Sequence, residues 1–126
     1  MRLWHQALIP KLPRAQLLGQ HREIAALRGN GWGKKHSTVD YVFTHPIEHL
    51  VAYHYKVLEE MRSRGYNHDI DWIDVSYCGK SCNRITIFDD VTFFDALDVD
   101  IIYPEHNDEY LRECIENLKG KGVEIE

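Results

Sequence analysis

The chain has 126 residues, of which 44% are hydrophobic and 28% are charged. This length suits one hydrophobic core and is too short for two domains of ordinary size, so we expect a single domain over residues 1–126. The composition excludes an intrinsically disordered chain. No apolar stretch approaches the roughly 20 residues that span a bilayer, and the N-terminus lacks a signal-peptide pattern, so we expect a cytoplasmic protein without a membrane partner.

Charge is unevenly distributed along the chain. Residues 1–66 hold ten Lys and Arg against five Asp and Glu, a formal charge of +5, whereas residues 67–126 carry −10. The overall charge of −5 does not favour nucleic-acid binding, which depends on neutralisation of phosphates by Lys and Arg. The basic half, however, also contains six of the eight histidines and could face a polyanion. Ordinary surface charge is the alternative explanation.

The first predicted helix spans about residues 13–28. Pro13 is tolerated in a first turn, and the glycines at 29, 31 and 33 end the helix. One face of this helix carries an apolar stripe. Another face carries three polar residues at i, i+4 and i+7 spacing, which are Gln16, Gln20 and Glu23. Glu23 is therefore expected to project from a polar face.

The glycine-rich loop at residues 29–37 follows this helix. Its glycines permit unusual backbone dihedrals and the close approach of a ligand backbone. Two lysines and an aromatic residue accompany them. The loop is therefore interpreted as facing an anion.

Two more helices are predicted further along the chain. The second spans residues 46–64 and buries a continuous apolar stripe at helical spacing. The third spans residues 107–119, with Asn107 as its N-terminal cap. Residues 69–104 contain strand-like runs, so either a short β-hairpin or an irregular connection precedes the last helix. The expected fold class is thus mainly α, a single-domain three-helix protein with this connection before its last helix.

The order of motifs in the first half of the chain resembles the pyrimidine-dimer DNA glycosylase family. Over residues 1–68 the matching segments are QLLGQHRE, GKKHSTVDYVF and EEMRSRGYN. The resemblance implies a DNA repair enzyme that binds damaged double-stranded DNA and cuts the glycosidic bond of the 5′ pyrimidine of a cyclobutane dimer. It also implies subsequent cleavage of the backbone as an abasic-site lyase. We expect a monomer that needs no cofactor and no metal.

The resemblance also indicates the catalytic residues. In the family a terminal amine attacks the sugar and forms a Schiff base, and a glutamate positioned like Glu23 assists. Family members usually expose a threonine amine after the initiator methionine is removed, but the bulk of Arg2 normally prevents that removal, so we expect the amine of Met1 to attack. Such an amine, with a pKa of about 7.7–8.0, is roughly 10–15% neutral at pH 7. Glu23 would stabilise positive charge on the sugar and shuttle protons; a solvated residue paired with a cation is the alternative.

A further group of residues is expected to contact DNA. Arg2 and Arg22 match family positions, and Arg28 is the substitute for an arginine that the family places nearer Glu23. Trp32 either wedges between displaced bases or covers the end of the first helix. The complete set of expected DNA-binding residues is Arg2, Gln16, His21, Arg22, Arg28, Trp32, Lys34, Lys35 and His36.

The C-terminal end departs from the family pattern. The family's aromatic, basic tail is absent, and an acidic segment ends this chain. This difference affects the expected preference for pyrimidine dimers more than the glycosylase or lyase chemistry. Another damaged or modified base is therefore an alternative substrate.

Three alternatives to this function or site remain open. His45 and His49, at i and i+4, could chelate zinc in a metal-dependent hydrolase. The three cysteines, expected to be free thiols, could instead hold a metal together with His106. A binding module that kept the fold and lost catalysis is the third alternative.

Overall fold

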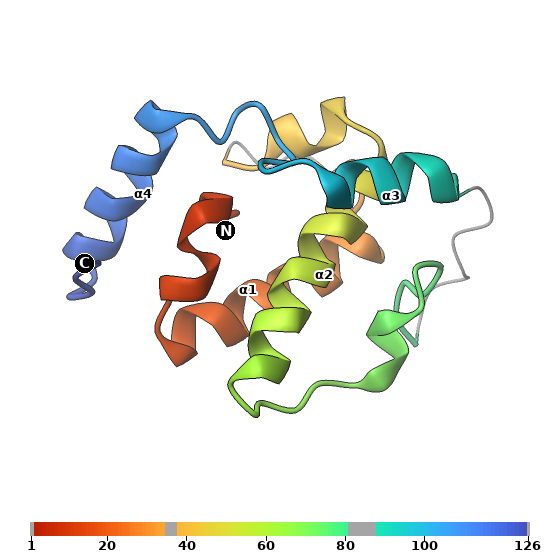
Figure 1. Cartoon of the computed structure of the whole chain (residues 1–126), viewed down its shortest axis with the longest axis horizontal. Coiled ribbons are helices and arrows are strands. Elements are labelled where there is room, and N and C mark those ends of the chain that lie inside the picture. The colour runs from red at the N-terminus through yellow and green to blue at the C-terminus, as the bar shows by residue number, and fades with distance from the viewer. Residues whose placement is uncertain (1, 35–37, 81–87, 126) are drawn as a thin grey trace.

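The computed structural model describes residues 2–34, 38–80 and 88–125 (Figure 1). These residues form four α-helices, α1 (Arg14–Arg28), α2 (Ile47–Ser63), α3 (Asp90–Asp98) and α4 (Asp108–Gly120). They also form three 3-10 helices, η1 (Gln6–Lys11), η2 (Asp40–Thr44) and η3 (Ile70–Ile73). The mainly α fold class is confirmed, since no strand occurs in the described part of the chain.

Helix α2 lies at the centre of the molecule and packs against both α1 and α3 (Figure 1). Its apolar stripe at helical spacing is buried in the core as the sequence predicts, and includes Leu50, Val57, Leu58 and Met61. The predicted helices at 13–28, 46–64 and 107–119 correspond to α1, α2 and α4 within about one residue at each end. In α4 the side chain of Asn107 accepts a hydrogen bond from the Tyr110 N–H at 2.9 Å, which is the expected cap.

The prediction of only three helices is wrong, because α3 occupies part of the connection. Its cap is Asp89, whose carboxylate accepts hydrogen bonds from the Val91 N–H at 3.1 Å and the Thr92 hydroxyl at 2.6 Å. A carboxylate oxygen of Glu48 in α2 accepts from the Asp89 N–H at 3.2 Å. Phe93 is buried and contacts the Tyr55 ring of α2. Tertiary contacts with α2 therefore stabilise a helix whose own periodicity is ambiguous.

The predicted β-hairpin is not confirmed. Its first expected strand contains η3, a 3-10 helix in which the Asp69 side chain accepts a hydrogen bond from the Asp71 N–H at 3.0 Å. Residues 84–87, which make up most of the second expected strand, lie outside the described residues. The described part of the connection therefore consists of η3, an irregular stretch over residues 74–80 and the helix α3.

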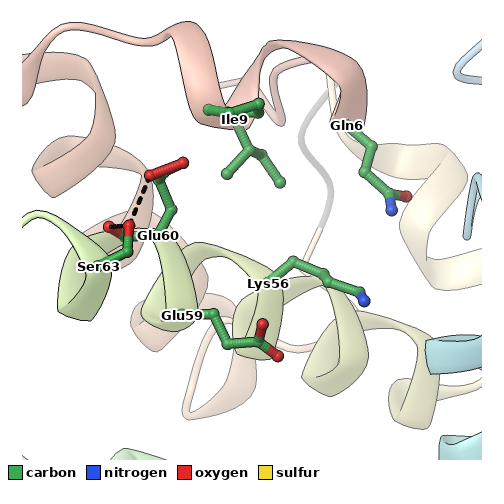
Figure 2. A pocket seen from close by; sticks show the side chains of 7 residues that line it. Gln6, Ile9, Lys56, Glu59, Glu60 and Ser63 are labelled. Atoms are coloured by element: carbon green, nitrogen blue, oxygen red, sulfur yellow. Dashed lines mark hydrogen bonds between the residues drawn. The ribbon is translucent and has the colours of Figure 1, made fainter.

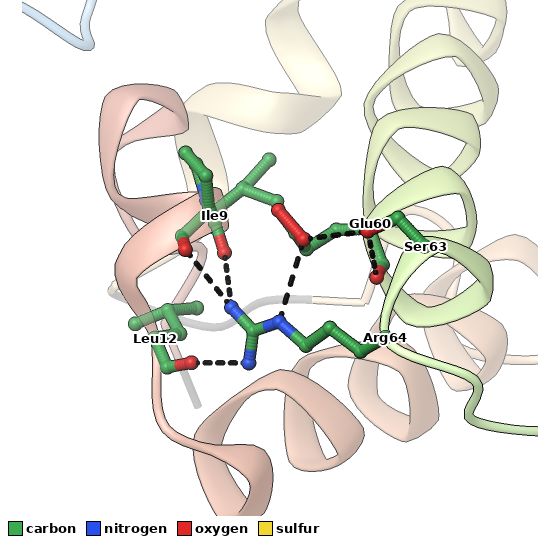
Figure 3. Close-up of polar contacts among 6 residues, drawn as sticks. Ile9, Leu12, Glu60, Ser63 and Arg64 are labelled. Carbon is green, nitrogen blue, oxygen red and sulfur yellow. Dashed lines mark hydrogen bonds and ion pairs between the residues drawn. The ribbon is translucent and has the colours of Figure 1, made fainter.

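Arg64, just beyond the end of α2, attaches the N-terminal segment to that helix (Figure 3). Its guanidinium donates hydrogen bonds to the carbonyl oxygens of Leu12 at 2.6 Å and Pro10 at 3.0 Å. Its Nε lies 3.4 Å from a carboxylate oxygen of Glu60. A planar fork of donors suits several acceptors at once, so one side chain fixes where η1 ends and α1 begins.

Gln6, at the start of η1, connects the N-terminal segment to the chain before α4. Its amide nitrogen donates to the Asp100 carbonyl at 3.1 Å, and its amide oxygen accepts from the Ile102 N–H at 2.8 Å. The backbone N–H of Gln6 donates to Nδ1 of His106 at 3.1 Å. Segments almost one hundred residues apart in the sequence are thereby held side by side.

The cysteines differ from one another. Cys78 is disulfide-bonded, so the expectation that all three thiols are free is wrong for this residue. Cys114 is a free thiol buried in the core, and its burial raises its pKa. Cys82 lies outside the described residues.

Of the helices that the structure describes, none combines the length and apolar character that crossing a bilayer requires.

Candidate active site

Glu23 projects from α1 into a hollow between the N-terminal segment and the end of α4. The hollow has a volume of about 200 Å³ and is lined by Arg2, Trp4, Glu23, Thr38, Asn117 and Lys121. One carboxylate therefore faces a polar, solvent-reaching space that also contains two cationic side chains. The expectation that Glu23 lies on a polar face of its helix agrees with this position.

The N-terminal segment beside this hollow is held by three helices. From α1, the Gln20 amide accepts a hydrogen bond from the Trp4 N–H at 2.7 Å and donates one to the Arg2 carbonyl at 3.0 Å. From α2, the Tyr53 hydroxyl donates to the Trp4 carbonyl at 2.5 Å. From α4, the Tyr110 hydroxyl donates to the Leu3 carbonyl. Residues 2–4 therefore have a defined position relative to Glu23, while Met1 lies outside the described residues.

Two cationic side chains share this hollow with Glu23. Arg2 forms an ion pair with Glu113 at 3.0 Å and lies over the Tyr110 ring, 5.8 Å from its centroid. The Lys121 ammonium lies 5.8 Å from the centroid of the Trp4 ring. The hollow therefore combines one carboxylate with two cationic side chains, a combination that could accept an anionic group such as a phosphate.

The remaining expected phosphate contacts fall into exposed and buried groups. Arg22 and Lys34 are exposed, and Gln16 is half-buried on α1. Lys34 borders a second hollow of about 410 Å³, which α1 and the glycine loop line together with Trp72 and Gly79. Lys35 and His36 lie outside the described residues. Arg22 and Lys34 are thus positioned where a DNA backbone could reach them.

Arg28 does not face solvent, so its expected role in phosphate binding is not supported. Its side chain is 2% exposed, and its guanidinium donates to the carbonyls of Trp72 at 3.1 Å, Asp74 at 3.0 Å and Tyr77 at 2.8 Å. Burial lowers its pKa to about 10. The arginine instead attaches residues 72–77 to the end of α1.

His21 belongs to a half-buried chain of hydrogen bonds that starts at Arg28. Because a guanidinium can only donate, Arg28 Nη1 donates to Nδ1 of His54 at 3.0 Å. His54 then donates from Nε2 to Nδ1 of His21 at 2.8 Å, which leaves the hydrogen of His21 on its Nε2. Burial lowers the pKa of His21 to about 4, so the ring is neutral at pH 7. These contacts of His21 are therefore internal to the protein.

Trp32 packs within the protein rather than standing free. Its ring meets the Phe43 ring edge to face, with centroids 5.1 Å apart, and the residue is half-buried against the core. The Trp32 ring therefore packs against η2, and its expected wedge or covering role stays a prediction.

The histidine pair proposed as a metal site makes other contacts. His45 Nε2 lies 3.0 Å from a carboxylate oxygen of Glu105, and the rings of His45 and His49 stack with centroids 5.7 Å apart. Across residues 2–34, 38–80 and 88–125, no group of three or more His, Cys, Asp or Glu side chains is arranged to hold a metal ion. His106, which was the expected partner of the three cysteines in a metal site, is buried. Its Nε2 lies 2.7 Å from the Tyr41 hydroxyl.

Another hollow, of about 290 Å³, lies between η1 and α2 (Figure 2). Lys56 and Glu59 of α2 line it, and Ser63 there is hydrogen-bonded to a carboxylate oxygen of Glu60 at 3.0 Å. None of the residues expected to be catalytic or to bind DNA lines this hollow. It is therefore not the candidate active site.

The sequence patterns did not predict several residues that line the hollow around Glu23. Trp4, Thr38, Asn117 and Lys121 line the hollow, but the last two lie beyond the segment that resembles the family. The helical spacing puts Gln20 on the same polar stripe as Glu23, and this pattern is a signal in the sequence that Gln20 belongs near the site. Its partners on the N-terminal segment and α2 become apparent only in the tertiary structure.

Comparison with known proteins identifies a family. Residues 1–74 match the family model described as pyrimidine dimer DNA glycosylase, which covers more than half of the 126 residues. The matched segment contains Arg2, Trp4, Glu23 and Thr38 of the hollow. No curated protein and no solved structure gave a match.

Proposed function

We propose that this chain, which belongs to the pyrimidine dimer DNA glycosylase family, excises a damaged pyrimidine through a Schiff base on its N-terminal amine and then acts as an abasic-site lyase. The observation that carries the proposal is the relation between Arg2 and Glu23. Both line one hollow, and the Gln20 amide nitrogen contacts the Arg2 carbonyl at 3.0 Å and a Glu23 carboxylate oxygen at 3.4 Å. Because consecutive Cα atoms are about 3.8 Å apart, this position of Arg2 supports the proposal that the amine of the preceding residue acts in the same hollow.

The chemistry begins with attack of the neutral amine of Met1 on the anomeric carbon of the sugar. The new C–N bond forms as the bond to the base breaks, and the base leaves with the electron pair. Opening of the sugar ring, with a proton delivered to the ring oxygen, produces the iminium. Removal of a proton from the neighbouring sugar carbon then expels the 3′ phosphate by β-elimination. Glu23 stabilises the positive charge and relays these protons, as carboxylates do in other glycosidic cleavages.

Borohydride trapping tests this function. The protein is incubated with borohydride and duplexes that contain one cyclobutane pyrimidine dimer, one abasic site, one oxidised base or no damage. We expect a covalent protein–DNA product on denaturing gels with the dimer and abasic duplexes and none with undamaged DNA, because reduction makes the Schiff base permanent. Trapping on the oxidised base but not on the dimer would assign a different lesion. Binding to damaged DNA without any covalent product would identify a binding module and overturn the proposed chemistry.

The salt dependence of DNA affinity tests the phosphate contacts. Replacing Arg22 or Lys34 with glutamine should lower the slope of log affinity against log salt by about one unit, because each contact releases about one counterion. Fluorescence anisotropy with an abasic duplex measures the slope. Lys119→Gln is the matched control. Asn117 lines the hollow, and Lys119 lies two positions further along α4, which places it on nearly the opposite face of that helix. An unchanged slope would remove the replaced residue from the interface.

A further inference from the structure

Gln20 is a buried polar side chain one turn before Glu23 on α1. It is 1% exposed, and both ends of its amide have partners. The oxygen accepts from the Trp4 N–H at 2.7 Å, and the Tyr53 hydroxyl, which donates its proton to the Trp4 carbonyl, lies 3.2 Å from it. The nitrogen donates to the Arg2 carbonyl at 3.0 Å and lies 3.4 Å from a carboxylate oxygen of Glu23. Both ends of the primary amide therefore have partners within the N-terminal part of the protein.

These contacts join two parts of the active site through one rigid group. An amide is planar, so its nitrogen fixes the Arg2 carbonyl and the Glu23 carboxylate relative to each other. The Trp4 N–H, which donates to the amide oxygen at 2.7 Å, holds the opposite end of the amide and opposes its rotation. The backbone that leads to the terminal amine and the carboxylate that serves it therefore share one support.

We propose that Gln20 is a positioning residue, which holds the N-terminal backbone and the Glu23 carboxylate so that amine and carboxylate act on the same sugar carbon. This inference rests on the proposed function. A purely structural role would require only the contacts with Arg2, Trp4 and Tyr53. The contact with Glu23 adds a connection to the reacting group, and this connection separates positioning from stability.

Gln20→Glu tests the positioning role, because glutamate has the same shape. It keeps an oxygen acceptor for the Trp4 N–H, loses the amide donors to Arg2 and Glu23, and places a second carboxyl group beside Glu23. We expect the rate of borohydride trapping on an abasic duplex to fall about 10- to 100-fold, since small displacements of reacting groups have effects of this size. The acid limb of the pH–rate profile should move to higher pH, because two adjacent carboxyl groups do not readily ionise together.

Two further variants separate positioning from folding. Gln20→Met has a similar length, adds no charge, and should lower the trapping rate without moving the acid limb. Tyr110→Phe is the matched control, since it removes one hydrogen bond to the same N-terminal segment, at Leu3, without touching Gln20 or Glu23. It should lower the melting temperature and keep the wild-type pH profile. Anisotropy with the abasic duplex should show affinities within about threefold of wild type for all three variants, because the DNA-facing cations are unchanged.

The outcomes distinguish this inference from the proposed function. If both Gln20 variants trap as fast as Tyr110→Phe, with the wild-type pH profile, the positioning role is overturned and the function stands. If Gln20→Glu does not fold, Gln20→Met alone decides through the same comparison of rates. If the wild-type protein does not trap at all, the proposed function fails.

Discussion

Adding a short Gly-Ser extension before Met1 is expected to abolish borohydride trapping. The extension converts the amine of Met1 into an amide, whose nitrogen has no available lone pair, and it moves the new terminal amine away from Glu23. A lysine of ordinary pKa is only about 0.04% neutral at pH 7, against roughly 10–15% for a terminal amine, so a substitute lysine should be slower by about 300-fold. Trapping rates on an abasic duplex, compared with and without the extension, measure the effect. An extension joined through a protease site provides the control, because cleavage back to Met1 should restore the rate.

Lys121 is the alternative nucleophile to test, because its side chain lines the same hollow as Glu23. If trapping survives the extension and disappears in Lys121→Met, a lysine performs the attack and the proposed nucleophile is wrong.

Glu23→Gln is the companion variant. It should retain DNA binding while losing most trapping, because it removes the group that stabilises charge and relays protons but keeps the phosphate-binding cations.

The second large effect is expected on stability. Replacing Arg28 with methionine should lower the free energy of unfolding by about 3–5 kcal/mol, because it removes a buried hydrogen-bonding group and leaves its partners unsatisfied. These partners include the carbonyls of Trp72, Asp74 and Tyr77, together with Nδ1 of His54. Urea denaturation followed by circular dichroism measures the change.

Arg22 provides the matched control for this prediction, since it lies on the same helix and is exposed. Arg22→Met should change the free energy of unfolding by no more than about 0.5 kcal/mol. Arg28→Lys keeps a charge without the planar fork and should also be destabilised. If Arg28→Met were as stable as Arg22→Met, the buried contacts of Arg28 would contribute little to stability.

The contrast between Arg22 and Arg28 illustrates what local sequence cannot reveal. Both are arginines on one helix, six positions apart, and both were expected to bind phosphate. A guanidinium suits a phosphate and a cluster of carbonyl oxygens equally well. The carbonyl acceptors of Arg28 come from residues 72–77, more than forty positions further along the chain. Only the tertiary structure shows which of the two environments each arginine occupies.

The sequence by itself determined the parts of this protein that depend on local chemistry. Helices α1, α2 and α4 follow from apolar spacing, proline and glycine boundaries, and the Asn107 cap. The family follows from motifs within the first 68 residues, and the match over residues 1–74 confirms it. The polar stripe of α1 also placed Glu23 and Gln20 on a common face.

The tertiary structure decided whatever depends on partners distant in the sequence. Helix α3 forms where Glu48 and Tyr55 of α2 meet its first turns, although its own sequence pattern is ambiguous. The hollow around Glu23 exists because Asn117 and Lys121 of the last helix region close onto the N-terminal segment. Local propensities are worth tenths of a kcal/mol to about one per residue, whereas burial and satisfied buried hydrogen bonds are worth about one to several. Burial and buried hydrogen bonds therefore determine which polar residues form the site and which hold the fold together.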